Sequence, residues 1–203
     1  MTDRDSGTRP TPARLEAFSD GVLAIAITLL VLEIKVPDAE DGKLWSALGH
    51  LWPSYAAYAV SFLTIGIMWV NHHNLSRRLE SVDHGVVYAN IALLGAISFL
   101  PFPTAVLADY LHKGGVNEHA AAALYGLTMM GISIAFLALW MQLKKRPALL
   151  QATAQSNVDR QTAQAAIAIP VYGIAVAISF ASATAALAVY GFIAVGFAFN
   201  KLT

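Results

Sequence analysis

The segment from Arg14 to Ile34, RLEAFSDGVLAIAITLLVLEI, joins ionisable side chains directly to a hydrophobic run. Its uncharged part extends only from Gly21 to Leu32. This is too short for a helix that crosses a bilayer alone in lipid, which needs about 20 apolar residues. The charged end of this helix must therefore lie against protein or in water. An ionisable group at membrane depth also marks a candidate functional site.

The rest of the chain is predominantly hydrophobic. Hydrophobic residues make up 57% of its 203 residues and charged residues 13%, whereas soluble domains have about 25% charged residues. Six apolar blocks, with their flanks, have the length of helices rather than barrel strands: 21–32 (extended back to Arg14), 52–70, 86–100, 120–143, 163–181 and 183–199. The sequence predicts an all-α integral membrane protein with six transmembrane helices. Residues 14–203 would form a single domain after a short tail, 1–13. No room remains for a soluble catalytic domain, so we do not expect an enzyme.

The charged residues predict how the chain is oriented. With the N-terminus inside, ten Lys and Arg residues fall on the inner side and three on the outer side. The inner ones are Arg4, Arg9, Arg14, Arg77, Arg78, Lys144, Lys145, Arg146, Arg160 and Lys201, and the outer ones are Lys35, Lys43 and Lys113. This bias predicts a multi-pass protein of the cell (inner) membrane with both termini in the cytoplasm. The formal net charge of zero gives no support for nucleic-acid binding.

Two features between the blocks indicate where helices end. Pro101-Phe-Pro103 must kink or end the helix that contains residues 86–100. Residues 109–118, which include Gly114 and Gly115, are predicted to form an outer loop.

The helix of residues 14–34 has two different faces. Because successive side chains on a helix point about 100° apart, Ile25, Leu29 and Leu32 share one narrow face. The Thr28 hydroxyl lies at the edge of this aliphatic stripe. Asp20 falls on nearly the opposite side, which directs it into its own helix bundle. Periodicity alone favours contact of this stripe with lipid.

The polar residues at the inner end have candidate partners on neighbouring helices. Trp69 and His73 are four residues apart and share a helix face, and Asn90 lies at a similar depth. A buried Asp20 must be paired or hydrogen-bonded. Because Asp20 points away from the aliphatic stripe, we favour a polar clamp over a proton relay through Asp20 and His73. A metal site at His72 and His73 is disfavoured because adjacent helical residues point about 100° apart.

Several motifs resemble those of the transmembrane protein 175 family of potassium channels. They are Arg14-x-x-x-Phe18-Ser19-Asp20-Gly21 running into the aliphatic segment 25–33, Trp69-Val-Asn-His-His73, and Phe99-Leu-Pro-Phe-Pro-Thr104. The resemblance covers most of the chain. The last two helices match in placement and length rather than in motif.

The resemblance implies a homotetramer of six-helix subunits in the lipid bilayer, with the first helix lining a central pore. It places the constriction at Ile25, with Leu29 and Leu32 in the next layers and Thr28 as the neighbouring selectivity residue. It assigns Arg14, Phe18, Ser19, Asp20, Trp69 and His73 to a structural polar network. Potassium ions would permeate, and no metal or other cofactor is expected.

The resemblance thus implies a modestly potassium-selective channel whose hydrophobic constriction replaces a carbonyl filter. A ring of aliphatic side chains offers an ion no ligand and can gate by dewetting. Two alternatives remain open. One is a proton-coupled secondary transporter that uses Asp20 and His73, and the other is a membrane scaffold without transport activity.

Overall fold

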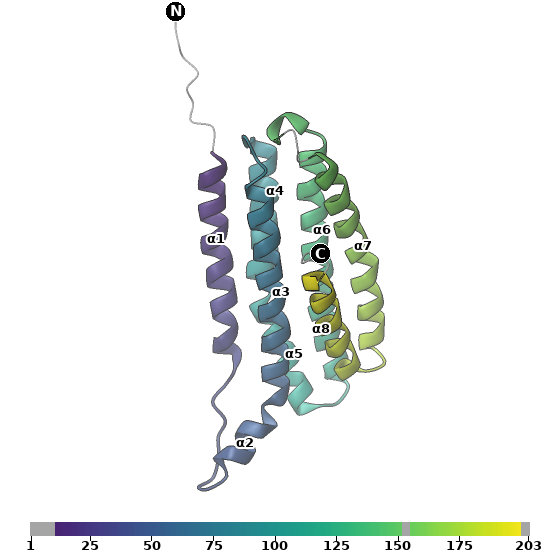
Figure 1. Ribbon diagram of the computed structural model, residues 1–203. Helices are drawn as coiled ribbons and strands as arrows, with labels where there is room; N and C mark the ends of the chain where they lie inside the picture. The colour runs from purple at the N-terminus through teal and green to yellow at the C-terminus, as the bar shows by residue number, and fades with distance from the viewer. Residues whose placement is uncertain (1–10, 152–154, 200–203) are drawn as a thin grey trace, which may run out of the picture.

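The computed structural model describes residues 11–151 and 155–199. In these ranges the chain is helical, apart from loops and an isolated β-bridge between Leu79 and Leu150. The helices are α1 (Pro12–Leu29), η1 (Leu30–Glu33), α2 (Leu44–His50), α3 (Trp52–Ser76), α4 (His84–Ser98), α5 (Pro101–Lys113), α6 (Asn117–Lys144), η2 (Pro147–Leu149), α7 (Gln155–Ser179) and α8 (Ala183–Phe199). The long helices run side by side, with α1 at one edge and α7 and α8 at the other (Figure 1).

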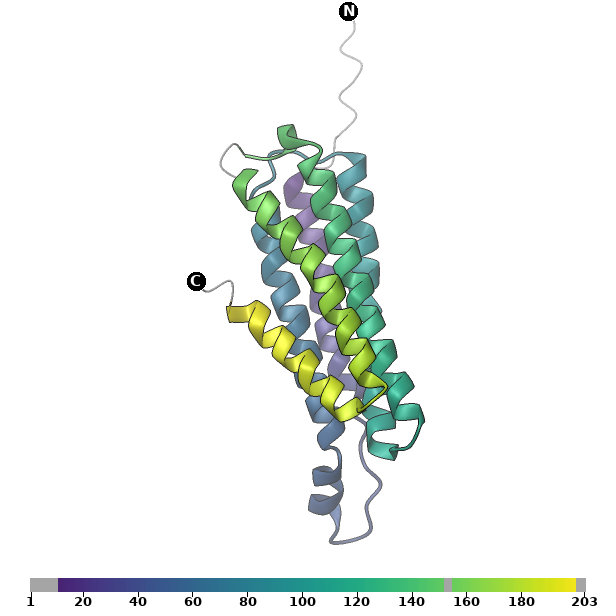
Figure 2. The ribbon, with the colours of Figure 1, turned by 90° about the vertical axis from the view of Figure 1, so that its right-hand side faces the viewer.

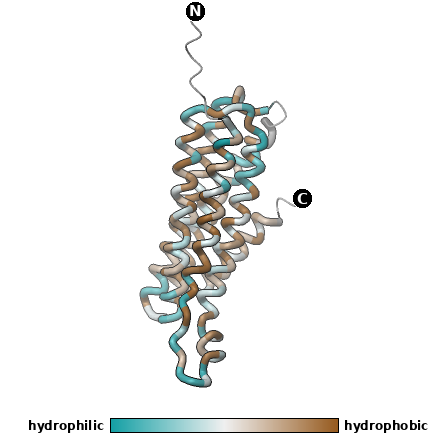
Figure 3. Tube along the Cα trace, turned by 90° about the vertical axis from the view of Figure 1, so that its left-hand side faces the viewer, coloured by the Kyte–Doolittle hydropathy of each residue, from teal (hydrophilic) through white to brown (hydrophobic). Residues whose placement is uncertain are grey.

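The lengths and hydropathy of the helices confirm the predicted membrane-protein class. Within the described ranges, five segments are long and apolar enough to cross a membrane: Pro12–Glu33, Trp52–Ser76, His84–Lys113, Asn117–Lys144 and Val158–Ser179. The sixth predicted span corresponds to α8, which has 17 residues and would extend about 25 Å. It ends part-way along the bundle (Figure 2). Hydrophobic residues concentrate along the middle of the bundle and hydrophilic ones gather at its two ends (Figure 3).

Prolines set several of the helix boundaries. Pro101 ends α4 and occupies the first turn of α5, where a missing N–H costs no hydrogen bond. The third predicted span is therefore two helices joined by a two-residue turn. The predicted outer loop 109–118 is wrong in extent, because α5 continues to Lys113 and α6 begins at Asn117. The actual turn contains Gly114 and Gly115, both with positive φ, which glycine adopts without strain.

Contacts between two loops close the end of the bundle where α1 begins. The backbone N–H of Glu80 donates to the Leu149 carbonyl at 2.9 Å, and that of Gln151 donates to the Arg78 carbonyl at 3.0 Å. Arg146 forms an ion pair with Asp83, whose carboxylate also caps the first turn of α4. These contacts tie the α3–α4 loop to the segment that leads into α7.

The helices α6, α7 and α8 pack through small residues and tyrosines. A Cβ atom added at Gly126 would lie 2.6 Å from a Val176 methyl group and closer still to the Tyr190 hydroxyl. That hydroxyl donates to the Ala122 carbonyl at 2.9 Å, and the Tyr125 and Tyr190 rings lie 5.0 Å apart. Close backbone approach of this kind is typical of helix contacts in membranes.

Candidate functional site

Helix α1 packs mainly against α3 and α4 and leaves one face uncovered. Its buried residues follow a helical spacing: Leu15, Ser19, Leu23 and Ala26, continued by Leu30 in η1. The opposite face carries Ile25, which is 62% exposed, Leu29, which is 41% exposed, and Leu32, which is 65% exposed. The exposed residues lie where the helical period predicts the aliphatic stripe. The described residues of one subunit therefore leave most of this stripe uncovered.

Two details shape the uncovered face. The Thr28 hydroxyl lies within hydrogen-bond distance of the Ala24 and Ile25 carbonyls, at 3.0 and 2.9 Å, so its proton is used inside the helix and its lone pairs point outward as acceptors. Residues 30–33 form a 3₁₀ turn, in which residues three apart align along the helix. Leu32 therefore lies over Leu29 rather than about 60° away, as an ideal α-helix would place it.

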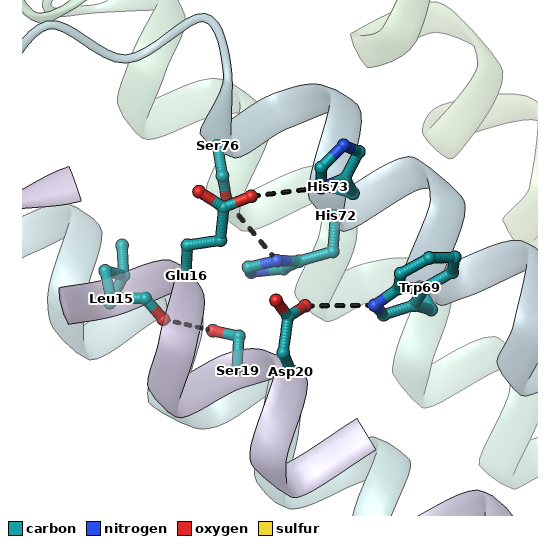
Figure 4. Close-up of polar contacts among 8 residues, drawn as sticks. All are labelled: Leu15, Glu16, Ser19, Asp20, Trp69, His72, His73 and Ser76. Atoms are coloured by element: carbon teal, nitrogen blue, oxygen red, sulfur yellow. Dashed lines mark hydrogen bonds and ion pairs between the residues drawn. The ribbon is translucent and has the colours of Figure 1, made fainter. Parts of the chain in front are cut away.

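Two carboxylates on α1 pair with two aromatic residues on α3 (Figure 4). Trp69 Nε1–H donates to Asp20 Oδ1 at 3.0 Å, and His73 Nδ1 lies 3.0 Å from Glu16 Oε1. The Trp69 and His73 rings stack with centroids 5.8 Å apart. Because α1 and α3 are antiparallel, the step of four residues from Glu16 to Asp20 on α1 runs beside the step of four residues back from His73 to Trp69 on α3. The two pairs therefore fix both the depth and the rotation of α1.

A second set of hydrogen bonds connects three helices deeper in the bundle. The Asn90 side chain on α4 donates to Ser19 Oγ at 2.9 Å, and Ser19 Oγ–H donates to the Leu15 carbonyl at 2.8 Å. The side-chain amide oxygen of Asn90, Oδ1, lies 2.7 Å from His72 Nε2. Because that oxygen only accepts, His72 carries a proton on Nε2. The Ser76 hydroxyl approaches His72 Nδ1 at 3.5 Å, and all four of these polar side chains are buried.

Two of the residues predicted for the polar network lie elsewhere in the structure. The Arg14 side chain is exposed, and it forms no hydrogen bond or ion pair within the described ranges. Phe18 is 55% exposed and lies about 20° from Ile25 on the helical wheel, on the same face. Helix periodicity explains both positions, because only residues near Ser19 and Asp20 on the opposite face can reach α3 and α4.

The partners differ from those that depth alone suggested. His73 binds Glu16 rather than Asp20, so the described residues show no direct Asp20–His73 contact for the proton relay considered above. The sequence interpretation missed Glu16 and Ser76 as partners. The pairing of Glu16 could have been predicted, because Glu16 and Asp20 have the same four-residue spacing as Trp69 and His73. In the described ranges, no three His, Asp or Glu side chains are grouped to hold a metal ion.

Comparison with known proteins places this arrangement in a family. The family model of TMEM175, the endosomal/lysosomal potassium channel, matches residues 14–101. A potassium channel of Streptomyces collinus is 46% identical over 191 residues, covering 93% of this chain and 92% of the relative. The chain belongs to the TMEM175 family.

Further TMEM175 relatives support the assignment over nearly the whole length. A potassium channel of Chamaesiphon minutus is 43% identical over 192 residues, covering 93% of this chain and 94% of the relative. The crystal structure of a lysosomal potassium-selective channel TMEM175 homolog from Chamaesiphon minutus superposes with a TM-score of 0.84 at 41% identity. It covers 95% of this chain and 98% of that structure. TMEM175 proteins are ion channels and not enzymes, and the chain is accordingly a multi-pass membrane protein.

Proposed function

We propose that the chain is a potassium channel in which α1 lines the central pore of a homotetramer and Ile25 forms the narrowest ring. The observation that carries this proposal is the division of α1 into two faces. One face is anchored to α3 and α4 through Ser19, Glu16 and Asp20. The other presents an aliphatic stripe, from Ile25 to Leu32, on a helix at the edge of the bundle.

A four-fold arrangement around α1 accounts for the charged start of this helix. In a tetramer the stripes of four subunits face one another, and the short uncharged run 21–32 is enclosed by protein instead of lipid. Thr28 and Gly21 lie beside Ile25 on the same exposed face, so the proposed pore wall is not purely aliphatic. The relatives named as potassium channels support the same function.

The proposed selectivity follows from ion hydration. Ile25, Leu29 and Leu32 supply no oxygen ligand, so a potassium ion must cross their rings with much of its water. Stripping water from potassium costs less than stripping it from sodium, which gives a modest preference for potassium. A hydrophobic constriction of this kind closes by dewetting. Potassium is then the only species required, with no further cofactor.

The charge distribution supports a cytoplasmic N-terminus in a cell (inner) membrane. Among the described residues, seven Lys and Arg residues lie near the end where α1 begins and three lie near the other end. The first group is Arg14, Arg77, Arg78, Lys144, Lys145, Arg146 and Arg160, and the second is Lys35, Lys43 and Lys113. By the positive-inside rule, the end that carries seven Lys and Arg residues lies on the cytoplasmic side. Both termini are proposed to lie on that side.

The function is tested by ion flux from liposomes that contain the purified full-length protein. Flux down a potassium gradient should exceed flux down a sodium gradient. Ile25→Asn places amide groups in the proposed constriction and should raise sodium flux several-fold. The matched control is Ile174→Asn on α7, because Ile174 is 63% exposed and lies far from α1. Equal effects of the two substitutions would contradict the pore assignment.

The same liposomes distinguish the two alternatives. A proton-coupled carrier would give saturable, pH-coupled flux and would lose it in Asp20→Asn without loss of folding. A scaffold would give no flux. In the proposed channel, Asp20→Asn weakens the α1–α3 contact and reduces the yield of assembled tetramer, while the remaining tetramer conducts.

A further inference from the structure

Arg14 is a cation at the start of α1 that takes no part in the contacts of α1 with α3 and α4. Its side chain is exposed and forms no hydrogen bond or ion pair within the described ranges. Arg14 precedes Ile25 by eleven residues, so on an α-helix it lies about 20° from Ile25 around the axis and about 16 Å from it along the axis. Arg14 is therefore on the uncovered face of α1, at the end where the helix begins.

The two carboxylates of α1 lie away from Arg14. Around the helix, Arg14 is about 160° from Glu16 and about 120° from Asp20. Both carboxylates point toward α3 (Figure 4), and each has a partner on that helix. Within the described part of α1, Arg14 is the charged side chain of the uncovered face, and no carboxylate of the helix neutralises it.

Other carboxylates at this end of the bundle do not supply a counter-charge either. Asp83 forms an ion pair with Arg146. Asp159 forms one with Lys144. Glu80 is exposed and follows two arginines in the α3–α4 loop. The positive-inside rule explains a cation at this end of α1, but it does not explain why the cation lies on the face that α3 and α4 leave uncovered.

The outer end of α1 carries the opposite charge. Residues 33–43 contain four carboxylates and two lysines, which give this segment a net charge of −2. If α1 lines a pore, the two mouths of the pore therefore differ in the sign of their charge. A potassium ion meets repulsion at the mouth where α1 begins and attraction at the other mouth.

We propose that Arg14 forms a ring of positive charge at the cytoplasmic mouth of the pore and limits the entry of potassium ions from that side. The inference rests on the proposed function, in which four copies of α1 surround the pore. Four unit charges in water about 10 Å from the pore axis lower the potassium concentration at the mouth about twofold at about 0.15 M salt and about sevenfold at about 0.01 M. At about 1 M salt the Debye length is about 3 Å and the effect vanishes. Outward potassium current is therefore held below inward current.

The proposal is tested by recording potassium current through the full-length protein in inside-out patches of bacterial giant spheroplasts, in which the bath contacts the cytoplasmic side. Bath potassium stays at about 0.01 M, and N-methylglucamine chloride raises the ionic strength of the bath from about 0.01 M to about 1 M. The readout is the ratio of outward to inward current at matched driving forces. In the unmodified channel this ratio should rise as the salt concentration increases.

Three variants separate the charge of Arg14 from its hydrogen-bonding geometry. Arg14→Gln removes the charge and should raise the outward current about sevenfold at the lowest salt and leave it unchanged at about 1 M. Arg14→Lys keeps the charge and should behave as the unmodified channel. The matched control is Lys145→Gln, because Lys145 is an exposed cation at the same end of the bundle. It follows α6, which lies on the other side of α3 from α1 (Figure 1), so this variant should leave the current unchanged.

A thiol at position 14 tests the charge in the assembled channel. The chain contains no cysteine, so Arg14→Cys introduces a single thiol in each subunit. A cationic methanethiosulfonate reagent added to the bath should restore the low outward current, and an anionic one should raise the outward current above that of unreacted Arg14→Cys. Because the reagents act after assembly, this comparison holds even if Arg14→Gln folds poorly.

Each result decides the proposal. An increase in outward current that follows the charge at position 14 and disappears at high salt supports it. Four results would overturn it and leave the channel function standing: no increase in Arg14→Gln at low salt, an increase that persists at about 1 M, an increase in Arg14→Lys, or equal responses to the two reagents. If the unmodified protein carries no potassium current, the proposed function fails and this inference fails with it.

Discussion

The two edges of the bundle hold their helices by different means. At one edge, α1 is attached to α3 and α4 by polar side-chain contacts of Glu16, Ser19 and Asp20. At the other edge, α6, α7 and α8 approach closely around Gly126, and Tyr190 fills the contact. Lipid is as apolar as leucine, so neither edge is held together by the hydrophobic effect that drives folding in water.

The difference matters because the two kinds of contact specify different things. Close packing around Gly126 depends on shape and tolerates no extra atom. The polar contacts of α1 are directional, so a rotation of α1 by one residue would break all of them. They therefore determine which face of α1 is left uncovered, and that face carries Ile25. Substitutions at the two edges should therefore lower the free energy of unfolding by different amounts.

The largest effect is expected at Gly126. Gly126→Val places a branched side chain where a single Cβ already collides with Tyr190 and Val176, and overpacking of this kind costs about 3 kcal/mol or more. The free energy of unfolding is measured by titration with a denaturing detergent. Gly131→Val is the matched control on the same helix, because a Cβ at Gly131 has no atom within 4 Å. Similar losses in the two variants would refute the close-packing interpretation.

The next effect is expected at Asn90, which joins α1 to α3 through α4. Asn90→Leu leaves Ser19 Oγ and His72 Nε2 without their buried partner and should lower the free energy of unfolding by about 2 kcal/mol. Asn74→Leu, at an exposed site, should change it by less than about 0.5 kcal/mol. If Asn90→Leu is as stable as the unmodified protein, the buried network does not hold α1.

A smaller effect is expected for the contact between Trp69 and Asp20. Trp69→Phe keeps an aromatic ring beside His73 and removes the donor to Asp20. The free energy of unfolding should fall by at most about 1 kcal/mol, because Trp69 is exposed and Asp20 is half-buried, and hydrogen bonds between helices in membranes average about 0.6 kcal/mol. A double-mutant cycle with Asp20→Asn isolates the coupling. A coupling energy of zero would show that this hydrogen bond does not help to hold α1 against α3.

The smallest effect is expected for Glu16 and His73. Their contact is 3.0 Å, but the side chains are 26% and 39% exposed, and exposed ion pairs contribute about 0–1 kcal/mol. Glu16→Gln should therefore change the free energy of unfolding by less than about 1 kcal/mol. The measurement is the same detergent titration, repeated at high salt, where the difference should shrink further. A loss above that of Asn90→Leu would reverse the proposed ranking.

The sequence predicts the helices and the two faces of α1 well, because apolar block length and the 3.6-residue period act locally. It also predicts the break at Pro101. It does not predict α2, since a seven-residue helix is too short to show a period. Which of His72 and His73 contacts Asn90 and which contacts Glu16 depends on the rotation of α3 about its axis, and the sequence leaves that rotation open. The 3₁₀ turn that aligns Leu32 with Leu29 likewise depends on how α1 ends against its neighbours.

The central claim is that the face of α1 with Ile25 lines an aqueous pore rather than meeting lipid. The chain contains no cysteine, so Ile25→Cys and Ile174→Cys each introduce a single thiol. A charged, water-soluble thiol reagent added to the conducting protein in liposomes should react at position 25 and block potassium flux, and should leave the Ile174→Cys protein unaffected. Unchanged flux after modification of Cys at position 25, or failure of that thiol to react while the protein conducts, would contradict the pore assignment.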